Sequence, residues 1–291
     1  MAKNIAFSRI IGYNTVMNIL KEYKHNGIYV KHAADDSPRD SAFPMHIHQN
    51  YEIYLFIKGK VKYLVEGSSY PLYPGSILII RPNESHKPKI LESSPYERFN
   101  INFHPSVLKC IDPEQRLLSP FLDRALGRDN MYSISELGDI PVRKLFFDMC
   151  YAHNDTYASD IKILTNLLYI LDALRVAFDM HSTGIKHPKS REEEMVAYVN
   201  EHLSGVISVP ILAEHFYMSP SQFSRIFKSA TGASPWEYIS IKRLSNARDL
   251  IRSGESAQQA FCQSGYGDYS AFYRAYLRHF GYTPTDEKKK K

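Results

Sequence analysis

The sequence predicts an α+β protein: an N-terminal antiparallel β-barrel with helices, followed by an all-α C-terminal domain with two helix-turn-helix units. Three observations support this prediction. Residues 29–103 contain short runs of β-branched and aromatic residues separated by turn formers. Beyond about Pro141, apolar residues recur at the three- and four-residue spacing of helices. A capped two-helix pattern then occurs twice before the C-terminus.

Composition limits the class of protein. The 291 residues are enough for two domains, and the excess of Lys and Arg (36) over Asp and Glu (31) allows contact with a polyanion without establishing it. Cys110, Cys150 and Cys262 have no CxxC spacing, so we expect neither a disulfide framework nor a structural zinc site. Because the sequence has no signal-peptide pattern and no long apolar run, we expect a cytoplasmic protein that does not enter a membrane.

The barrel strands are predicted from short apolar runs and the turns between them. Ile53 to Ile57 and Val61 to Val65 flank Lys58-Gly59-Lys60, which indicates a hairpin. Ile77 to Ile80 follows a Pro-Gly turn, and Phe99 to Phe103 alternates apolar with polar residues. Many short antiparallel strands of this kind are typical of a barrel or sandwich.

A helix is predicted after the barrel. Its apolar stripe comprises Ile161, Leu164, Leu168, Leu171 and Leu174. Such a stripe either covers the barrel or forms a dimer seam, and the sequence leaves both interpretations open. The predicted divisions are a barrel (1–140), a helical covering or dimerisation segment (141–180), a linker (181–189), a two-unit helical domain (190–285) and a basic tail (286–291).

Capping residues mark the helices of the C-terminal third. Ser190, Ser219, Ser234 and Ser256 each stand three residues before Glu or Gln, which is the pattern of a capping box. Glycines at 232, 254 and 281 stand where helices should end. These start and stop signals predict about seven helices in the C-terminal third.

One structural unit is repeated at an offset of 49 residues (268 − 219 = 49). The matched pairs are Ser219 and Asp268, Ser221 and Ser270, Phe223 and Phe272, Arg225 and Arg274, Phe227 and Tyr276, Gly232 and Gly281, and Pro235 and Pro284. In each copy a short helix leads through a tight turn to a second helix, which is the helix-turn-helix pattern. In the second turn we expect positive φ at Gly265 and Gly267.

The second helix of each unit should bury an aromatic stripe and expose polar side chains. The residues predicted to face outward are Ser221, Ser224, Arg225 and Lys228 in the first unit, and Tyr269, Ser270, Tyr273, Arg274 and Arg278 in the second. Arginine can bond a guanine edge in two places, and a helix N-terminus attracts phosphate. A solvated bundle surface would explain one copy, whereas two copies in register favour DNA binding.

The region from about Arg191 to Pro284 resembles the AraC/XylS-type DNA-binding domain. The matching motifs are Leu212-Ala213, Met218-Ser219-Pro220-Ser221, Phe227-Lys228, Thr231-Gly232, Ser234-Pro235, Arg243-Leu244, Gly265-Tyr266, Phe280-Gly281 and Thr283-Pro284. In that family a long helix, here 235–252, holds two reading heads that enter adjacent major grooves. The resemblance implies base contacts by Ser221, Ser224 and Arg225 in the first head, and by Ser270, Tyr273 and Arg274 in the second. Lys228, on the outer face of the first head, is a further expected DNA contact.

Two positions depart from the family pattern. Ala260-Phe261 replaces an aliphatic residue followed by alanine, and Tyr276-Leu277 replaces Phe-Lys. Loss of that lysine removes one candidate phosphate contact, so we expect a modest weakening of electrostatic affinity in the second head.

The N-terminal half contains a histidine pattern similar to cupin barrels. His46, His48, Glu52 and Gly59 have the spacing of the first cupin motif, and 81–86 resembles the second. Side chains two residues apart share a strand face, so His46 and His48 could meet His86 across the barrel, and the set would suit Zn, Fe, Mn or Ni. AraC-type regulators commonly carry such a cupin-like sensor without a catalytic metal, and Asp40 replaces an expected glycine. We therefore predict no metal, no other cofactor and no catalytic residue.

The sequence thus predicts an effector-controlled transcription regulator and not an enzyme. The residues expected to bind a small, sugar-like effector are His46, His48, Glu52, Tyr54, Arg81 and His86. Expected partners are promoter half-sites in double-stranded DNA, a second copy of the chain and the transcription machinery. The alternatives are a metal-dependent cupin enzyme with a helical interaction module, a metal-sensing regulator, and an alkyl-transfer repair regulator, for which the isolated cysteines offer no dedicated site.

Overall fold

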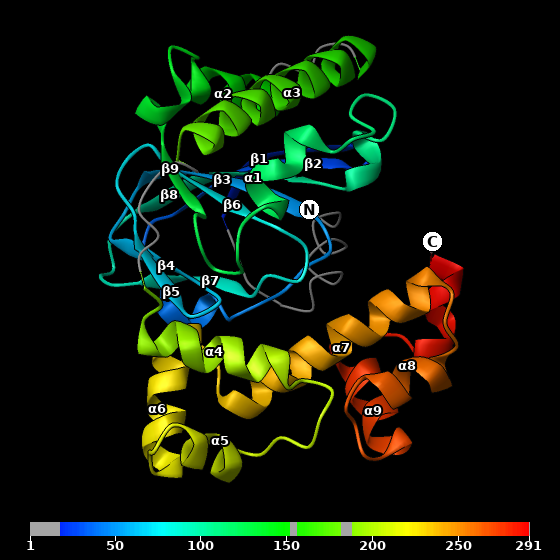
Figure 1. The fold of residues 1–291 in the computed structure, drawn as a ribbon. Helices are drawn as coiled ribbons and strands as arrows, with labels where there is room; N and C mark the ends of the chain where they lie inside the picture. Colours follow the sequence, from blue (N-terminus) through cyan, green and yellow to red (C-terminus); the bar gives the residue numbers. More distant parts are fainter. Residues whose placement is uncertain (1–17, 152–155, 182–187, 291) are drawn as a thin grey trace.

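The computed structural model describes residues 18–151, 156–181 and 188–290. A β-rich part lies between two helices on one side and a helical domain on the other (Figure 1). The strands are β1 (Ile19–His25), β2 (Ile28–Asp35), β3 (Tyr51–Lys58), β4 (Val61–Val65), β5 (Ser68–Pro71), β6 (Ser76–Ile80), β7 (His86–Ile90), β8 (Tyr96–Phe103) and β9 (Met131–Ser133). The α-helices are α1 (Ser119–Leu122), α2 (Val142–Tyr151), α3 (Thr156–His181), α4 (Arg191–Glu201), α5 (Val209–His215), α6 (Pro220–Thr231), α7 (Pro235–Ser253), α8 (Ala257–Gln263) and α9 (Tyr269–Phe280).

Two antiparallel sheets form the barrel, and this confirms the predicted fold class. The larger sheet has the order β1-β2-β8-β3-β6-β9, and the smaller has the order β5-β4-β7. The runs predicted around Ile53, Val61, Ile77 and Phe99 correspond to β3, β4, β6 and β8. An isolated bridge between His46 and His86 adds one residue pair at the β7 edge of the smaller sheet.

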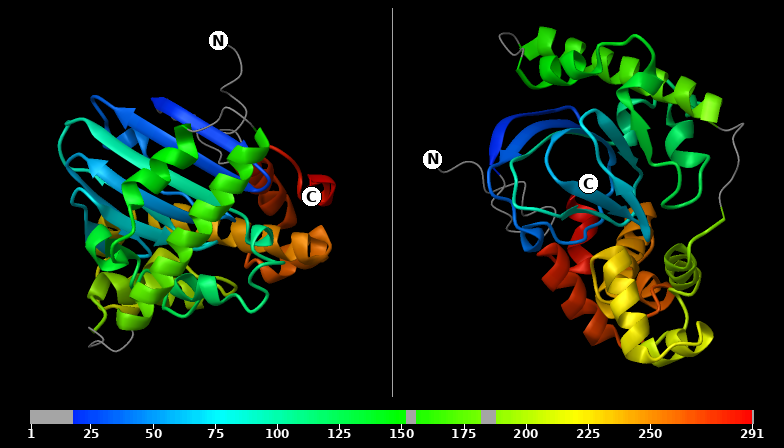
Figure 2. Two further views of the ribbon diagram at one scale, coloured as in Figure 1. Left: turned by 90° about the horizontal axis from the view of Figure 1, so that it is seen from above. Right: turned by 90° about the vertical axis from the view of Figure 1, so that its left-hand side faces the viewer.

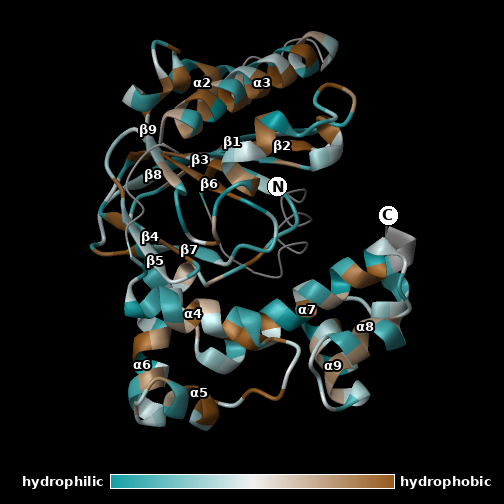
Figure 3. Ribbon diagram, in the orientation of Figure 1, coloured by the Kyte–Doolittle hydropathy of each residue, from teal (hydrophilic) through white to brown (hydrophobic). Residues whose placement is uncertain are grey.

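Strand alternation separates two apolar cores. Ile53 and Leu55 of β3 belong to the core between the larger sheet and helices α2 and α3. Tyr54 and Phe56 belong to the core inside the barrel. This period of two is expected for a strand that is covered on both faces. Seen from above, α3 lies across the strands (Figure 2), and apolar residues colour α2, α3 and the strands beneath them (Figure 3).

Helix α3 packs most of the predicted stripe against the barrel. Leu171 and Leu174 are fully buried, but Ile161 is 51% exposed. The face against the sheet also includes Ile163 and Leu167, which the predicted stripe lacks. Leu164 and Leu168 are partly buried against the same core, so the predicted stripe departs from the packed face mainly at Ile161.

The C-terminal domain has two cores at opposite ends of α7. One core joins α4, α5 and α6 to the first half of α7, and the other joins α8 and α9 to its second half. In the described residues this domain contains six α-helices and a final 3-10 helix (Pro284–Lys290). This agrees with the predicted number of helical segments.

The capping predictions are partly confirmed. Ser190 and Ser256 form reciprocal capping boxes, whereas the Ser219 and Ser234 side chains each accept only the backbone N–H three residues on. Proline opens the helix at both of those one-sided caps. Gly265 has the expected positive φ of 79°, but Gly267 is not among the residues with positive φ.

The predicted linker and tail are only partly described. Helix α3 runs to His181, residues 182–187 lie outside the described residues, and Ser190 is already the N-cap of α4. Among the helices that the structure describes, none is both long and apolar enough to cross a membrane.

Candidate DNA-reading heads and barrel pocket

The first head consists of α5, a tight turn and α6. Ser219 caps α6 by accepting a hydrogen bond from the Gln222 backbone N–H at 3.2 Å. Phe223 and Phe227 are fully buried, and the ring of Phe227 lies edge-on to that of Tyr238 in α7. These contacts anchor α6 through its apolar face and leave its polar face outside.

The outer face of α6 carries the residues predicted from the sequence. Ser221, Arg225 and Lys228 are exposed, and Ser224 is half-buried. Arginine and lysine supply hydrogen-bond donors and positive charge. This face can therefore bind phosphate and the base edges of a major groove.

The second head repeats this arrangement with α8 and α9. Asp268 caps α9 through a 2.6 Å hydrogen bond from the Ala271 backbone N–H, and Phe272 is fully buried. On the outside, Ser270 and Arg274 are exposed, while Tyr273 is half-buried. The two heads lie at opposite ends of α7 (Figure 1).

The structure explains one departure from the family pattern. The hydroxyl of Tyr276 donates a 2.5 Å hydrogen bond to Glu287, which also accepts one from Arg252 at 2.7 Å. The tyrosine therefore ties α9 to the final 3-10 helix and to α7. Leu277, at the position of the expected lysine, is 42% exposed.

Three histidines converge inside the barrel. Potential ligand atoms of His46, His48 and His86 all lie within 4.8 Å of one another. The ring centroids of His46 and His86 are 4.2 Å apart because these residues pair directly through their backbones. Glu52 joins the group from β3, with an oxygen 2.8 Å from His48 Nε2 and 3.7 Å from His86 Nε2.

Backbone contacts fix how the three imidazoles are oriented. The Nδ1 atoms of His46, His48 and His86 face the carbonyl oxygens of Pro44, Asn50 and Glu84, at 3.1, 2.9 and 2.8 Å. A carbonyl oxygen only accepts, so each Nδ1 must carry the proton that it donates. In the neutral rings of His46 and His86, each Nε2 is then an unprotonated lone pair. His48 Nε2 differs, because it lies 2.8 Å from the Glu52 carboxylate, which only accepts hydrogen bonds.

One of these nitrogens has no hydrogen-bond partner. Within the described part of the chain, His86 Nε2 is a buried polar atom without one, and the His86 side chain is 0% exposed. Buried polar groups are normally satisfied, so this atom calls for an occupant of the pocket.

The charges around the cluster are compatible with a positive ion. Burial favours the neutral form of Glu52, but His48 and His86 outweigh it and hold the pKa of Glu52 well below its usual range. Burial, together with the two neighbouring imidazoles, also lowers the pKa of His46 well below its usual value. The cluster therefore combines a neutral imidazole with a carboxylate, and this donor set fits a divalent transition metal.

Two of the predicted effector residues lie outside this cluster. Tyr54 is buried, and its hydroxyl lies 2.8 Å from that of Tyr96. Arg81 donates hydrogen bonds of 3.2 to 3.3 Å to the carbonyl oxygens of Phe121, Leu122 and Arg124. Arg81 thus holds the loop around α1 and does not turn toward the histidines.

The structure adds polar residues that the sequence analysis missed. Asn100 donates a 2.5 Å hydrogen bond to Glu52. Lys31 is aligned with Asn100 across β2 and β8, and burial, aided by the nearby charge of Arg98, lowers the pKa of Lys31 to about 8. The pairing of β2 with β8 places Lys31 and Asn100 on the barrel side of the sheet. The sequence contains no motif that would have identified either residue as part of the site.

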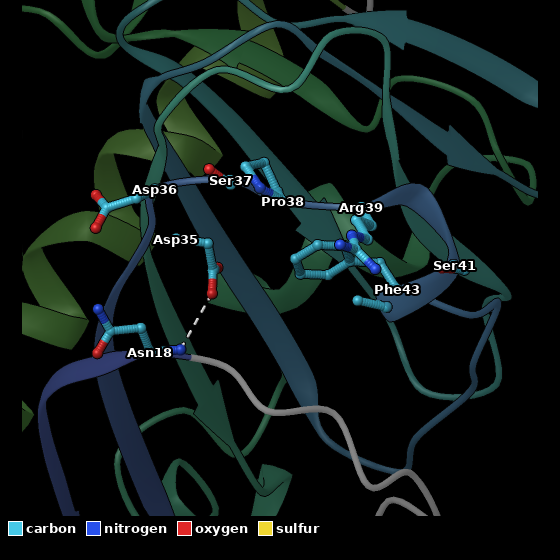
Figure 4. A pocket seen from close by; sticks show the side chains of 9 residues that line it. Asn18, Asp35, Asp36, Ser37, Pro38, Arg39, Ser41 and Phe43 are labelled. Atoms are coloured by element: carbon cyan, nitrogen blue, oxygen red, sulfur yellow. Dashed lines mark hydrogen bonds between the residues drawn. The ribbon is translucent and has the colours of Figure 1, made fainter.

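A second hollow lies beside the strands, outside the histidine cluster. It has a volume of about 320 Å³ and is lined by Asn18, Phe43 and the intervening loop residues 35–39, 41 and 42 (Figure 4). Asp35 points into it and accepts a 3.1 Å hydrogen bond from the Asn18 backbone N–H.

Comparison with known proteins agrees with this arrangement. Residues 32–160 match the family described as an AraC-like ligand binding domain, and residues 212–290 match a helix-turn-helix domain. The chain is an AraC-type transcription regulator. Both halves of this AraC-type regulator are therefore accounted for: one binds a ligand and the other binds DNA.

Similar proteins span most of the AraC-type chain. The HTH-type transcriptional activator RhaS of Escherichia fergusonii is 24% identical over 84% of this chain and 87% of its own length. The probable transcriptional regulator LumQ of Photobacterium leiognathi is 27% identical over 84% and 92%. The solved structure of ToxT from Vibrio cholerae covers 90% of this chain and 97% of that protein at 13% identity, with a TM-score of 0.40.

Proposed function

We propose that this regulator reads promoter DNA with the outer faces of α6 and α9. The observation that carries this proposal is the placement of two polar helix faces at the ends of one continuous helix, α7. In the first head the contacts come from Ser221, Ser224, Arg225 and Lys228, and in the second from Ser270, Tyr273 and Arg274. Because α7 fixes both heads, each copy of the chain reads two successive major grooves.

The barrel is proposed to bind a small polar effector at the histidine cluster. His46, His48, Glu52 and His86 supply its contacts, and Lys31 and Asn100 add a cation and an amide on the same side of the sheet. Hydrogen-bonding groups beside tyrosine rings suit a sugar-like molecule, as expected from the sequence. In this proposal Tyr54 does not contact the effector but packs beside the site with Tyr96, and Arg81 holds the neighbouring loop through backbone carbonyl oxygens.

A homodimer would present two such units to paired half-sites. Ile161, Tyr169 and Val176 expose apolar surface on α3 at 51%, 49% and 38%, on the side away from the barrel. We propose this face as the dimer seam, with residues 141–180 as the dimerisation segment between the barrel and the linker. The protein would act in the cytoplasm as a regulator and not an enzyme. We propose that it activates transcription, as the name of RhaS states for that relative, and that it does so together with the transcription machinery.

The test is a pull-down of genomic fragments by the purified protein at two salt concentrations, followed by sequencing. Enrichment of a few promoter fragments that persists at the higher salt supports specific reading. Uniform binding that is lost with salt would contradict it and favour the enzyme alternative.

A further inference from the structure

The outer face of the smaller sheet carries three lysines, Lys60, Lys62 and Lys89, which we call the lysine face. Lys62 of β4 and Lys89 of β7 are register partners, so their side chains lie directly opposite each other on one face of the sheet. Tyr63, which follows Lys62, belongs to the core inside the barrel, so the lysines are on the outside. Lys60 stands two residues before Lys62, and its carbonyl oxygen accepts a 2.9 Å hydrogen bond from the Leu91 backbone N–H.

The charges of the lysine face are not balanced within the chain. Like charges that stand directly opposite each other destabilise a sheet. Within the described part of the chain, none of the three lysines forms an ion pair, with exposed Glu92 or with any other carboxylate. Asp40 lies at this sheet edge, but it already binds Lys87 Nζ and the Ile90 backbone N–H, each at 3.1 Å. The acidic first turn of α4 lies at the other end of β4, beside Gly67. An anionic partner would relieve this repulsion.

The lysine face adjoins the first reading head. Two residues before Lys89 on β7, the Lys87 side chain lies against Gly232, the C-cap of α6, where an added Cβ would stand 2.3 Å from Lys87 Cδ. Helix α6 also contacts β4, and Figure 1 shows the smaller sheet next to this helix. Residues two apart on a strand share a face and are separated by about 7 Å. The lysine face therefore begins about 7 Å from the end of α6 and extends to about 14 Å at Lys60.

The polar face of α6 leads to the same point. Lys228 lies one helical turn before Gly232, whose backbone N–H donates a 2.8 Å hydrogen bond to the Lys228 carbonyl oxygen. Arg225, three residues before Lys228, is exposed on the same face of the helix. Positive side chains thus continue from the reading face of α6, past its C-terminal end, onto the barrel.

Packing holds the barrel against this head. Met45 and Ile47 of the barrel lie in the core of the first head with Phe223, and the Gln49 side-chain amide donates to Ser245 of α7 at 3.0 Å. The second head is built differently. Among the described residues, every member of its apolar core comes from α7, α8, α9 or the segments next to them, and none comes from the barrel. The lysine face therefore accompanies the first head, and not the second, onto DNA.

We propose that Lys60, Lys62 and Lys89 bind phosphates of the DNA that flanks the site read by the first head. A major groove has phosphates along both edges, and one turn of DNA rises about 34 Å. Lysines within about 14 Å of the α6 C-cap can therefore reach the half-turn next to the groove that α6 enters. This inference rests on the proposed function and gives the barrel a direct part in DNA binding. Because the contacts are to phosphate, they add affinity without sequence preference.

The test is fluorescence anisotropy of the full chain with one half-site from the pull-down, alone or extended by about 10 base pairs at either end. Base pairs whose recognition Arg225→Ala alters identify the end next to the first head. Extension at that end should tighten wild-type binding at least about tenfold, whatever the added sequence, and extension at the other end should not. The combined variant Lys60→Gln, Lys62→Gln and Lys89→Gln should lose this gain and reduce the salt slope by about 3. The control Lys144→Gln with Lys162→Gln, on α2 and α3 across the barrel, should keep the gain.

The triple variant should remain folded by circular dichroism and melt no lower than the wild type, since it removes the repulsion between Lys62 and Lys89. A wild type that gains nothing from extension, an equal gain at both ends, or a full gain in the triple variant would overturn the inference. Vesicles of anionic phospholipid that bind the wild type but not the triple variant, with no effect of DNA extension, would assign the face to a membrane surface instead. If the half-site binds no better than a scrambled fragment, the proposed promoter reading fails, whereas a selective half-site without an extension effect contradicts this inference alone.

Discussion

Glu66 of the barrel and Lys242 of α7 form an ion pair that is sealed between the two domains, with side chains 1% and 5% exposed. Tyr238 and Asn200 donate further hydrogen bonds to the same carboxylate, at 2.5 and 2.8 Å. The Lys242 ammonium also donates to the Asn83 carbonyl oxygen at 2.7 Å. The pair therefore connects the barrel to the α7 helix that holds both heads.

Removal of one partner should destabilise the contact between the domains. In Lys242→Met, the Glu66 carboxylate stays buried without its cation, and we expect a loss of about 3 kcal/mol in the free energy of unfolding. The measurement is urea denaturation of the full chain. Lys144→Met removes an exposed i,i+4 pair with Asp148 and should cost less than about 1 kcal/mol. Equal effects of the two substitutions would show that the interdomain pair is not specially important.

The two exposed arginines at equivalent positions should each contribute to operator affinity. Arg225→Ala and Arg274→Ala should each weaken binding to a cognate fragment by about 1–3 kcal/mol, since each removes donors to base edges or phosphate. Fluorescence anisotropy with a labelled fragment from the pull-down measures this change. Arg116→Ala, which alters an exposed arginine on the barrel side, is the control. Unchanged affinity in both head variants would contradict the assigned reading faces.

Acid should destabilise the second head through His279. Burial, reinforced by Arg248 and Arg278, lowers the pKa of His279 to about 4 from an ordinary value of 6.5. Between these values the unfolded chain binds a proton that the folded chain does not, so stability falls as the pH drops from about 6.5 to 4. Urea denaturation at pH 7 and pH 5 gives the free energy of unfolding at each pH. The loss of this free energy between pH 7 and pH 5 should be smaller in His279→Gln than in the wild type, by on the order of 1 kcal/mol. Identical losses in wild type and variant would exclude His279 as the cause.

The three cysteines should differ in reactivity. Cys110 and Cys262 are exposed, whereas Cys150 is buried in the core beneath α3, and burial raises the pKa of its thiol to about 12. A thiol reagent at pH 8 should therefore modify two of the three thiols in the native protein and the third only after denaturation. Cys262→Ser should reduce the native count by one, and rapid labelling of Cys150 would show that this core opens readily.

Patterns within short segments predicted much of this structure. The runs around Ile53 and Val61 predicted their strands because turn formers bound them closely, and the repeat that starts at Ser219 and Asp268 predicted both heads because caps and aromatic residues recur in register. His46, His48 and His86 were expected together from strand alternation, and the structure brings them together.

Features that depend on distant parts of the chain were not predicted. The face of α3 that packs on the barrel was predicted only in part: Ile161 is exposed, and Ile163 and Leu167 were not included, because the helix is apolar on more than one side. Arg81 was expected at the pocket, but its guanidinium meets carbonyl oxygens some forty residues away in the sequence. The roles of Met45 and Glu66 depend on how the domains meet, which local spacing does not encode.

Met45 and Ile47 of the barrel are part of the first head's core, and this limits how the sequence of that head can change during evolution. A core built from one domain can change under selection for its own operator, since compensating substitutions arise nearby in the same unit. The first head cannot change in this way, because part of its interior belongs to the sensor. In a chimaera that carries the barrel of another regulator, the core of the second head should therefore stay intact, whereas the core of the first head should pack poorly. We expect the barrel and the first head to have evolved together.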